Sequence, residues 1–148
     1  MQMMAPAGGQ CAKATHPNVV SVKCLRQISK SLDMTQTTKG LAICYWNACG
    51  ITGKMHDFRT FVDEHKPDLL LLQETKLKNN KNIYLPSYLL YRNDESQNPA
   101  SCGTSIFIKN SISHKEISIP NFSIISATIL SINLINQPPI KIASVYVP

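Results

Sequence analysis

Hydrophobic and polar positions divide the chain into two unlike parts, and the pattern changes near Gly40. Residues 41–46 form a short apolar run of strand-forming residues, and residues 68–73 form a second one. Between them, residues 54–66 carry apolar side chains at the three-to-four-residue spacing of a helix. A strand, a helix and a strand joined by short loops predict a βαβ unit, with parallel strands and a right-handed crossover.

The expected helix has an apolar face and recognisable ends. The side chains that predict this face are Met55, Phe58, Phe61, Val62 and His65. We expect Thr52 to cap the amino end of the helix and Pro67 to stop it.

The rest of the chain alternates between expected strands and polar loops. We expect strands at Ser87–Arg92, Gly103–Lys109, Ile117–Ile119, Ile124–Asn133 and Ile140–Val147. We expect a polar loop or a short helix at Lys76–Asn82 and an exposed loop at Asn93–Ser101. The last two strands are joined around Asn136–Pro139, which predicts a hairpin. Within the strand at 103–109, Ile106 and Ile108 are expected on one face and Phe107 on the other. The fold class is therefore α/β or α+β with a mixed sheet.

Composition limits the kind of protein. Of 148 residues, 43% are hydrophobic, which suits one folded domain and is too many for a wholly disordered chain. No apolar stretch approaches the roughly 20 residues of a membrane-spanning helix, so we expect a soluble protein. The first forty residues have no apolar core for a secretory signal, so we expect an intracellular protein that is not secreted.

Charge is concentrated in the first 39 residues. Residues 1–39 hold five cations and one anion, whereas ten cations face eight anions from Gly40 onward. We expect residues 1–39 to be a basic, disordered leader and residues 40–148 to be a folded domain. The leader could hold phosphates without reading sequence, could be a solvated tail, or could be an organelle presequence. The five cysteines form no CxxC pair, and their spacings match no zinc template.

Three polar residues stand at the ends of expected strands. Asn47 follows the first strand, Glu74 follows the second, and Tyr146 closes the last. Parallel strands open their carboxyl ends on one edge of a sheet, where ligands bind in open α/β folds. A carboxylate is the hard oxygen ligand that Mg²⁺ prefers, while an amide and a phenol can hydrogen-bond a phosphate. The alternatives are a solvated glutamate, a turn-forming asparagine and a core tyrosine.

Several motifs occur in a fixed order beyond residue 40. They are Trp-Asn-Ala-Cys-Gly-Ile at 46–51, Pro-Asp-Leu-Leu-Leu-Leu-Gln-Glu-Thr-Lys-Leu at 67–77, Tyr-Leu-Leu-Tyr-Arg at 88–92, Cys-Gly-Thr-Ser-Ile-Phe-Ile-Lys at 102–109, Ser-Ile-Ser-His at 111–114 and Ser-Val-Tyr-Val-Pro at 144–148. From about Leu41 to Pro148 the chain resembles the endonuclease/exonuclease/phosphatase superfamily. The Gln-Glu-Thr-Lys-Leu block and the segment at 108–114 are most similar to endonuclease domains of jockey-like non-LTR retrotransposons.

The resemblance implies a fold and an activity. The fold is the N-terminal half of a DNase I-like, four-layer α/β sandwich with mixed sheets. The activity is that of a Mg²⁺-dependent phosphodiesterase of the apurinic-endonuclease type, with Mn²⁺ as an alternative ion. In a retrotransposon such a domain nicks DNA, belongs to a polyprotein with a reverse transcriptase, and works in the nucleus.

The resemblance also implies roles for individual residues. Glu74 matches the metal-binding glutamate, and Asn47 matches the asparagine that orders the phosphate and its metal environment. Tyr146 matches the tyrosine that hydrogen-bonds the reacting phosphate. Tyr91 and Arg92 match a region that can face DNA.

One further match is imperfect. Gly103 falls on a Gly-Gly pair ahead of a strand in the family pattern. Cys102 replaces the first glycine, so we expect a crowded turn.

The family's Gly-Asp-Phe-Asn and Ser-Asp-His segments do not occur in this sequence. His56, His65 and His114 are not expected to replace them. We therefore expect a fragment that is inactive alone, consisting mainly of one sheet whose inner face lacks its partner. That face is expected to include residues such as Leu70, Leu72, Ile106, Ile129 and Val145, and the strand register decides which of them. The alternatives are a non-catalytic nucleic-acid-binding relic, or a superfamily member acting on phosphoinositide or lipid phosphodiesters.

Overall fold

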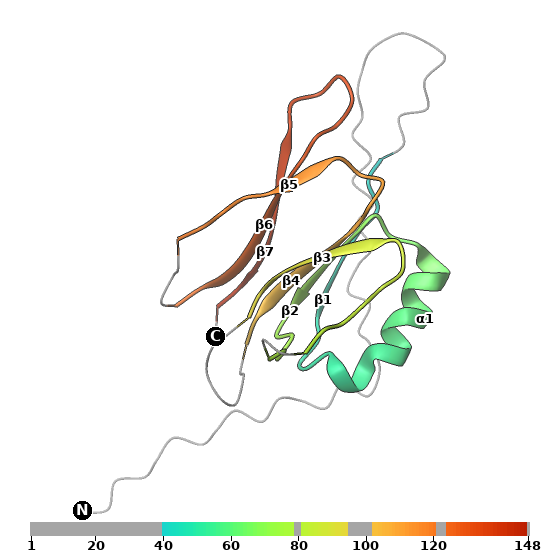
Figure 1. Cartoon of the computed structure of the whole chain (residues 1–148), viewed down its shortest axis with the longest axis vertical. Helices are drawn as coiled ribbons and strands as arrows, with labels where there is room; N and C mark the ends of the chain where they lie inside the picture. The colour runs from blue at the N-terminus through green and yellow to red at the C-terminus, as the bar shows by residue number, and fades with distance from the viewer. Residues whose placement is uncertain (1–39, 79–80, 95–101, 121–123, 148) are drawn as a thin grey trace, which may run out of the picture.

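The computed structural model describes residues 40–78, 81–94, 102–120 and 124–147. The expected leader at 1–39, most of the expected loop at 93–101, and Pro148 lie outside the described residues. Figure 1 shows two sheets lying against each other, with a helix on the far side of the larger one.

The larger sheet contains the predicted βαβ unit. Its four strands stand in the order β1-β2-β4-β3, namely β1 (Ile43–Asn47), β2 (Leu69–Gln73), β4 (Thr104–Lys109) and β3 (Tyr88–Asn93). β1 and β2 are parallel, as predicted, while β4 pairs antiparallel with both β2 and β3.

The helical segment crosses one face of this sheet. A short 3₁₀ turn, η1 (Thr52–Lys54), leads into α1 (Met55–His65). α1 ends at Lys66, which adopts the left-handed conformation (φ 46°) just before Pro67. The prediction for the helix stop is confirmed. The predicted cap is wrong: Thr52 lies inside η1, and no side chain caps either η1 or α1.

The smaller sheet is wholly antiparallel. It has the order β5-β6-β7, with β5 (His114–Glu116), β6 (Ser126–Ile132) and β7 (Ile140–Tyr146). β6 and β7 form the expected hairpin, in which Ile132 pairs with Ile140. The strand expected at Ile117–Ile119 is wrong by three residues, because β5 pairs through His114 to Glu116 instead.

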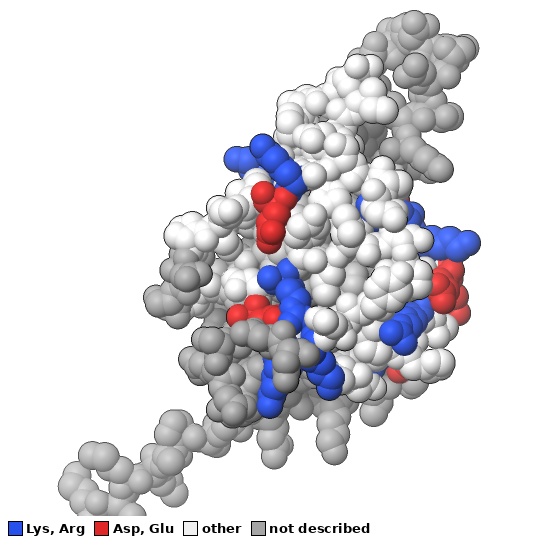
Figure 2. Space-filling model, in the orientation of Figure 1, with Lys and Arg blue, Asp and Glu red and all other residues white. Residues whose placement is uncertain are grey.

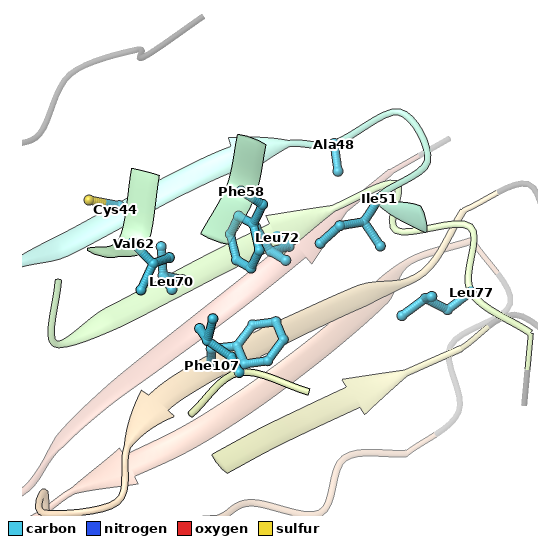
Figure 3. Packing of buried hydrophobic residues seen from close by; sticks show 10 residues of the cluster. Cys44, Ala48, Ile51, Phe58, Val62, Leu70, Leu72, Leu77 and Phe107 are labelled. Carbon is cyan, nitrogen blue, oxygen red and sulfur yellow. The ribbon is translucent and has the colours of Figure 1, made fainter. Parts of the chain in front are cut away.

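One core lies between α1 and the larger sheet. Phe58 and Val62 of α1 face Leu70 and Leu72 of β2 and Phe107 of β4, as Figure 3 shows. The Phe58 ring lies 5.9 Å from the Trp46 ring and 5.6 Å from the Phe107 ring, centroid to centroid. The expected helix face is therefore confirmed except at His65, which is exposed.

A second core lies between the two sheets. It consists of Leu69 and Leu71 from β2, Ile106 and Ile108 from β4, and Leu130 and Ile132 from β6. Five of these six are fully buried, and Leu71 is 8% exposed. The expectation of a single sheet with an uncovered inner face is therefore wrong. The smaller sheet belongs to the same chain and covers β2 and β4.

The register also moves residues between faces. Leu70 and Leu72 pack under α1, not between the sheets. Val145 lies on the outer face of the smaller sheet and is 47% exposed, while Ile129, which pairs with Ala143, is partly buried there. The described residues form three layers, α1 and the two sheets. The fold is mixed α/β, and none of its described helices is both long and apolar enough to cross a lipid bilayer.

Candidate active site

Asn47 and Glu74 meet at the carboxyl edge of β1 and β2. Asn47 is the last residue of β1, and Glu74 directly follows β2, where Asn47 pairs with Gln73. The Asn47 Nδ2 group donates a hydrogen bond of 2.7 Å to Oε1 of Glu74, and its Oδ1 accepts from the Cys49 backbone N–H at 3.1 Å. A carboxylate only accepts and a backbone N–H only donates, so both neighbours fix the same orientation of the amide. The convergence predicted from the topology is found for this pair.

The backbone around Glu74 is held from both sides. The loop after β1 bonds to it through Ala48 N–H to Gln73 O (2.9 Å), Gly50 N–H to Glu74 O (2.8 Å) and Ile51 N–H to Thr75 O (3.1 Å). Glu74 has φ 49°, a left-handed conformation that is uncommon for a residue with a side chain. Such a conformation persists where surrounding contacts over-determine it, and it is typical of functional sites.

The loop before β4 supplies the opposite wall. The Thr75 and Lys76 N–H groups donate to the Gly103 and Cys102 carbonyls at 3.2 and 3.0 Å. Gly103 has φ 107°, and a Cβ there would lie 2.8 Å from Thr75 Oγ1. Cys102 is buried and is not among the residues with positive φ. The positive φ therefore requires glycine at Gly103 and not at Cys102, and the crowding expected from Cys102 stays a prediction.

Lys76 is a site residue to which the sequence analysis gave no role. Its Nζ lies 4.0 Å from Glu74 Oε2 and 3.8 Å from Cys49 Sγ. The Glu74 side chain is only 15% exposed, so this cation offsets part of the cost of a mostly buried carboxylate. Lys76 belongs to the Gln-Glu-Thr-Lys-Leu motif, and a lysine two residues after the glutamate was the available signal.

Tyr146 lies toward the same edge from the other sheet. β7 runs in the same direction as β1 and β2, so their carboxyl ends share the lower edge in Figure 1. Ser144, two residues before Tyr146, is buried and donates a hydrogen bond of 2.8 Å to the Leu72 carbonyl in β2. Tyr146 follows on the same side of β7 and is partly buried. Its role at the phosphate stays a prediction.

Tyr91 and Arg92 lie on β3, the strand farthest from β1 in the larger sheet. The Tyr91 hydroxyl is 3.0 Å from Nε2 of His114, and Tyr91 packs against the inter-sheet core. Arg92 bonds to Oδ2 of Asp94 at 2.6 Å and to two backbone carbonyls of the segment between β2 and β3. These contacts with the protein itself favour structural roles, and direct contact with a substrate stays a prediction for both residues.

The donor set at this edge fits Mg²⁺ in part. Glu74 offers a carboxylate, and Asn47 orients it by a hydrogen bond. Mg²⁺ binds proteins through one or two carboxylates and keeps several waters or substrate phosphate oxygens. Among the described residues, no group of three or more His, Cys, Asp or Glu could hold a metal ion. The described residues therefore fit one side of a magnesium site.

Comparison with known protein families identifies the family of this chain. The model of the endonuclease/exonuclease/phosphatase family matches residues 44–142, a range that begins in β1 and ends in β7. The chain belongs to this family. The resemblance found in the ordered motifs is thereby confirmed.

Curated relatives of this family member are proteins of mobile elements. It is 34% identical over 84 residues to the RNA-directed DNA polymerase from mobile element jockey of Drosophila melanogaster, covering 57% of this chain and 9% of that protein. It is 30% identical over 116 residues to the RNA-directed DNA polymerase from mobile element jockey of Drosophila funebris. That match covers 78% of this chain and 12% of that protein. The chain is 40% identical over 75 residues to the probable RNA-directed DNA polymerase from transposon X-element of Drosophila melanogaster. That match covers 50% of this chain and 8% of that protein. The chain thus spans only 8 to 12% of these relatives.

A solved structure supports the fold. The crystal structure of the AP endonuclease LMAP from Leishmania major superposes with a TM-score of 0.54 at 21% identity. The match covers 70% of this chain and 39% of that one. The DNase I-like α/β fold expected from the resemblance is therefore confirmed.

Proposed function

We propose that this chain supplies one side of the Mg²⁺-dependent phosphodiesterase site of a DNA-nicking endonuclease domain, within a retrotransposon polyprotein. The hydrogen-bonded Asn47–Glu74 pair carries the proposal, because it aims a carboxylate at the carboxyl edge of a parallel strand pair. Membership of the family and likeness to mobile-element polymerases support DNA as the substrate.

Each residue would have a distinct task in the reaction. Glu74 would hold the metal ion, and Asn47 would keep its carboxylate in one orientation. A bound Mg²⁺ supplies positive charge that offsets the charge building on the phosphate oxygens. The Tyr146 hydroxyl would donate a hydrogen bond to a phosphate oxygen and so orient the phosphodiester.

The reaction also needs a base that activates the attacking water. At this edge the described residues hold the Glu74 carboxylate and, after β3, the Asp94 carboxylate, which is paired with Arg92. The family's Gly-Asp-Phe-Asn and Ser-Asp-His segments do not occur in the sequence. We infer that the base comes from a second polypeptide segment. On this proposal the chain alone nicks no DNA.

The test is complementation of the full chain with the region of a jockey polyprotein that follows its matched part. Conversion of supercoiled plasmid to nicked circles is measured with Mg²⁺ and with EDTA. We expect no nicking by either part alone and Mg²⁺-dependent nicking by the mixture. Glu74→Gln should lower the rate by about 100-fold or more, because several kcal/mol of charge stabilisation are lost. Asn47→Ala should lower it about 10–100-fold, as loss of a residue that orients a metal ligand does.

Glu64→Gln is the matched control, since Glu64 lies on α1 with its side chain 66% exposed. This variant should keep the full rate. Nicking by the chain alone would overturn the proposed division of the site. Equal rates for the mixtures with Glu74→Gln and with Glu64→Gln would overturn the assignment of Glu74.

A further inference from the structure

Between Glu74 and β3 the chain carries charges of one sign. From Thr75 to Ser87 the sequence contains three lysines and no Arg, Asp or Glu. From Gly40 onward as a whole, ten cations face eight anions. The positive charge of the folded part is therefore locally concentrated in the segment that leaves Glu74.

Arg92 gives this segment a defined shape. Its Nη1 donates to the Lys81 carbonyl at 2.6 Å, and its Nη2 donates to the Lys78 carbonyl at 3.1 Å. The Asp94 carboxylate, with Oδ2 2.6 Å from Nη2, holds the guanidinium in place. The Arg92 side chain is only 18% exposed, so its charge binds groups of the protein itself and is not part of the surface. The backbone carbonyls of Lys78 and Lys81 are turned inward, while both lysines are exposed.

Two further groups extend this surface. Tyr84 is 69% exposed, and its carbonyl accepts a hydrogen bond of 3.4 Å from Nη2 of Arg59 on α1. Figure 2 shows Lys and Arg side chains at several places on this face, and some of them lie on the lower part of the molecule, where this segment runs. We call Lys78, Lys81, Tyr84 and Arg59 the basic loop surface.

We propose that the basic loop surface binds the phosphodiester backbone of duplex DNA beside the cutting edge. The proposal rests on the proposed function for its partner and names the residues that hold that partner. Lysine, arginine and tyrosine are side chains that bind phosphate oxygens and position a protein on DNA without reading bases. The surface begins two residues after Lys76, whose ammonium lies 4.0 Å from the Glu74 carboxylate. A strand bound there continues toward the Asn47–Glu74 pair.

The hydrogen bonds from Arg92 to the Lys78 and Lys81 carbonyls allow the two lysine side chains to be tested separately from the backbone. Because Arg92 bonds the backbone of Lys78 and Lys81, substitution of their side chains leaves these hydrogen bonds in place. Lys78→Gln with Lys81→Gln therefore removes two cations from a segment of unchanged shape. The matched control is Lys115→Gln with Lys141→Gln, two exposed lysines that both pair with Ser131 in the smaller sheet. Both double variants change the net charge equally.

The experiment measures binding of the full chain to a fluorescein-labelled duplex DNA in EDTA, by fluorescence anisotropy over a range of salt concentrations. Each lost phosphate contact lowers the slope of log Kd against log salt by about 0.9. The Lys78→Gln/Lys81→Gln variant should lose about 1.8 from the slope, which corresponds to about 60-fold weaker binding at 0.1 M salt. The control pair should keep the wild-type slope.

Equal slopes for the two double variants would overturn the inference, because net charge alone would then explain binding. Glu74→Gln should keep the wild-type slope, since the assay contains no Mg²⁺. This separates the two proposals. Loss of nicking in Glu74→Gln with an unchanged slope in the loop variant refutes only the basic loop surface. A reduced slope in the loop variant, with no nicking by any complemented chain, refutes only the proposed enzyme.

Discussion

Replacing Gly103 by alanine is expected to disturb both the stability of the domain and the position of Glu74. Gly103 has φ 107°, a conformation that costs a residue with a side chain about 1–3 kcal/mol. The new Cβ would also lie 2.8 Å from Thr75 Oγ1, inside a fully buried site. Overpacking of this kind costs about 1–3 kcal/mol. The sum, about 2–6 kcal/mol, is a large part of the ~5–15 kcal/mol that stabilises a typical domain.

The two contributions can be separated by a double-mutant cycle with Thr75→Ala. This change removes the Oγ1 atom that the new methyl group would meet and leaves the backbone conformation of Gly103 as it was. In the Thr75→Ala background, Gly103→Ala should therefore cost only the conformational part, about 1–3 kcal/mol. The coupling between the two sites should be of the same size as the overpacking cost.

Urea unfolding of the full chain, followed by tryptophan fluorescence, measures these free energies. Trp46 is the only tryptophan, and its ring stacks on Phe58 in the core under α1, so its emission reports on this core. If Gly103→Ala costs the same with threonine and with alanine at position 75, the close contact between the two residues is not what makes glycine necessary. If it costs less than about 0.5 kcal/mol in both, the positive φ is not a constraint either.

Thr75, Tyr88 and Cys44 each give a further testable prediction. Thr75→Val should raise the free energy of unfolding by about 1–3 kcal/mol, because the buried Thr75 hydroxyl has no partner among the described residues; a lower value in urea unfolding would contradict this. Burial, followed by the charge of Asp68, raises the pKa of Tyr88 to about 12. The folded state therefore keeps the Tyr88 proton more tightly than the unfolded state, and the free energy of unfolding should fall as pH rises from about 10 to about 12. Tyr88→Phe should make this fall shallower, and urea midpoints that decline in parallel for both proteins would contradict the assignment. Burial also raises the pKa of the Cys44 thiol, so iodoacetamide should alkylate Cys44 far more slowly in native protein than in urea, as mass spectrometry of its peptide would show; equal rates would contradict its burial.

The meeting of Asn47 and Glu74 could be predicted because it follows from topology alone. Their sequence separation of 27 residues is spanned by one helix, and a βαβ unit places the ends of its strands on one edge whatever the side-chain packing. Tyr146 could be placed at the same edge only once the direction of β7 relative to β2 was known. No alternation of apolar residues fixes that direction, and it became visible only in the arrangement of both sheets.

The division into two sheets could not be read from the pattern. Each strand alternates in the same way whether its partner is in one sheet or the other, so Leu72 and Ile129 were expected on a single face. β5 was misplaced for a related reason. His114 to Glu116 is a mostly exposed edge strand with polar side chains, whereas the apolar residues at Ile117 and Ile119 lie beyond its pairing. That only the second position of the Cys102-Gly103 pair has a positive φ could not be read from the sequence either.

The inter-sheet layer changes character along its length, and the change falls toward the candidate site. At the far end the layer is aliphatic. At the near end, Thr104 at the start of β4 lies 3.0 Å from Thr128 and 3.4 Å from Ser126, oxygen to oxygen, and Ser144 bonds the Leu72 carbonyl.

Hydrophobic contact is non-directional, whereas a hydrogen bond weakens steeply when its geometry changes. The aliphatic end can therefore supply stability, while the hydroxyl end sets where β7 stands over β2. Since Tyr146 is two residues from Ser144 and Glu74 is two residues from Leu72, the bond between Ser144 and Leu72 fixes the relative height of the two strands that carry a tyrosine and a carboxylate to one edge.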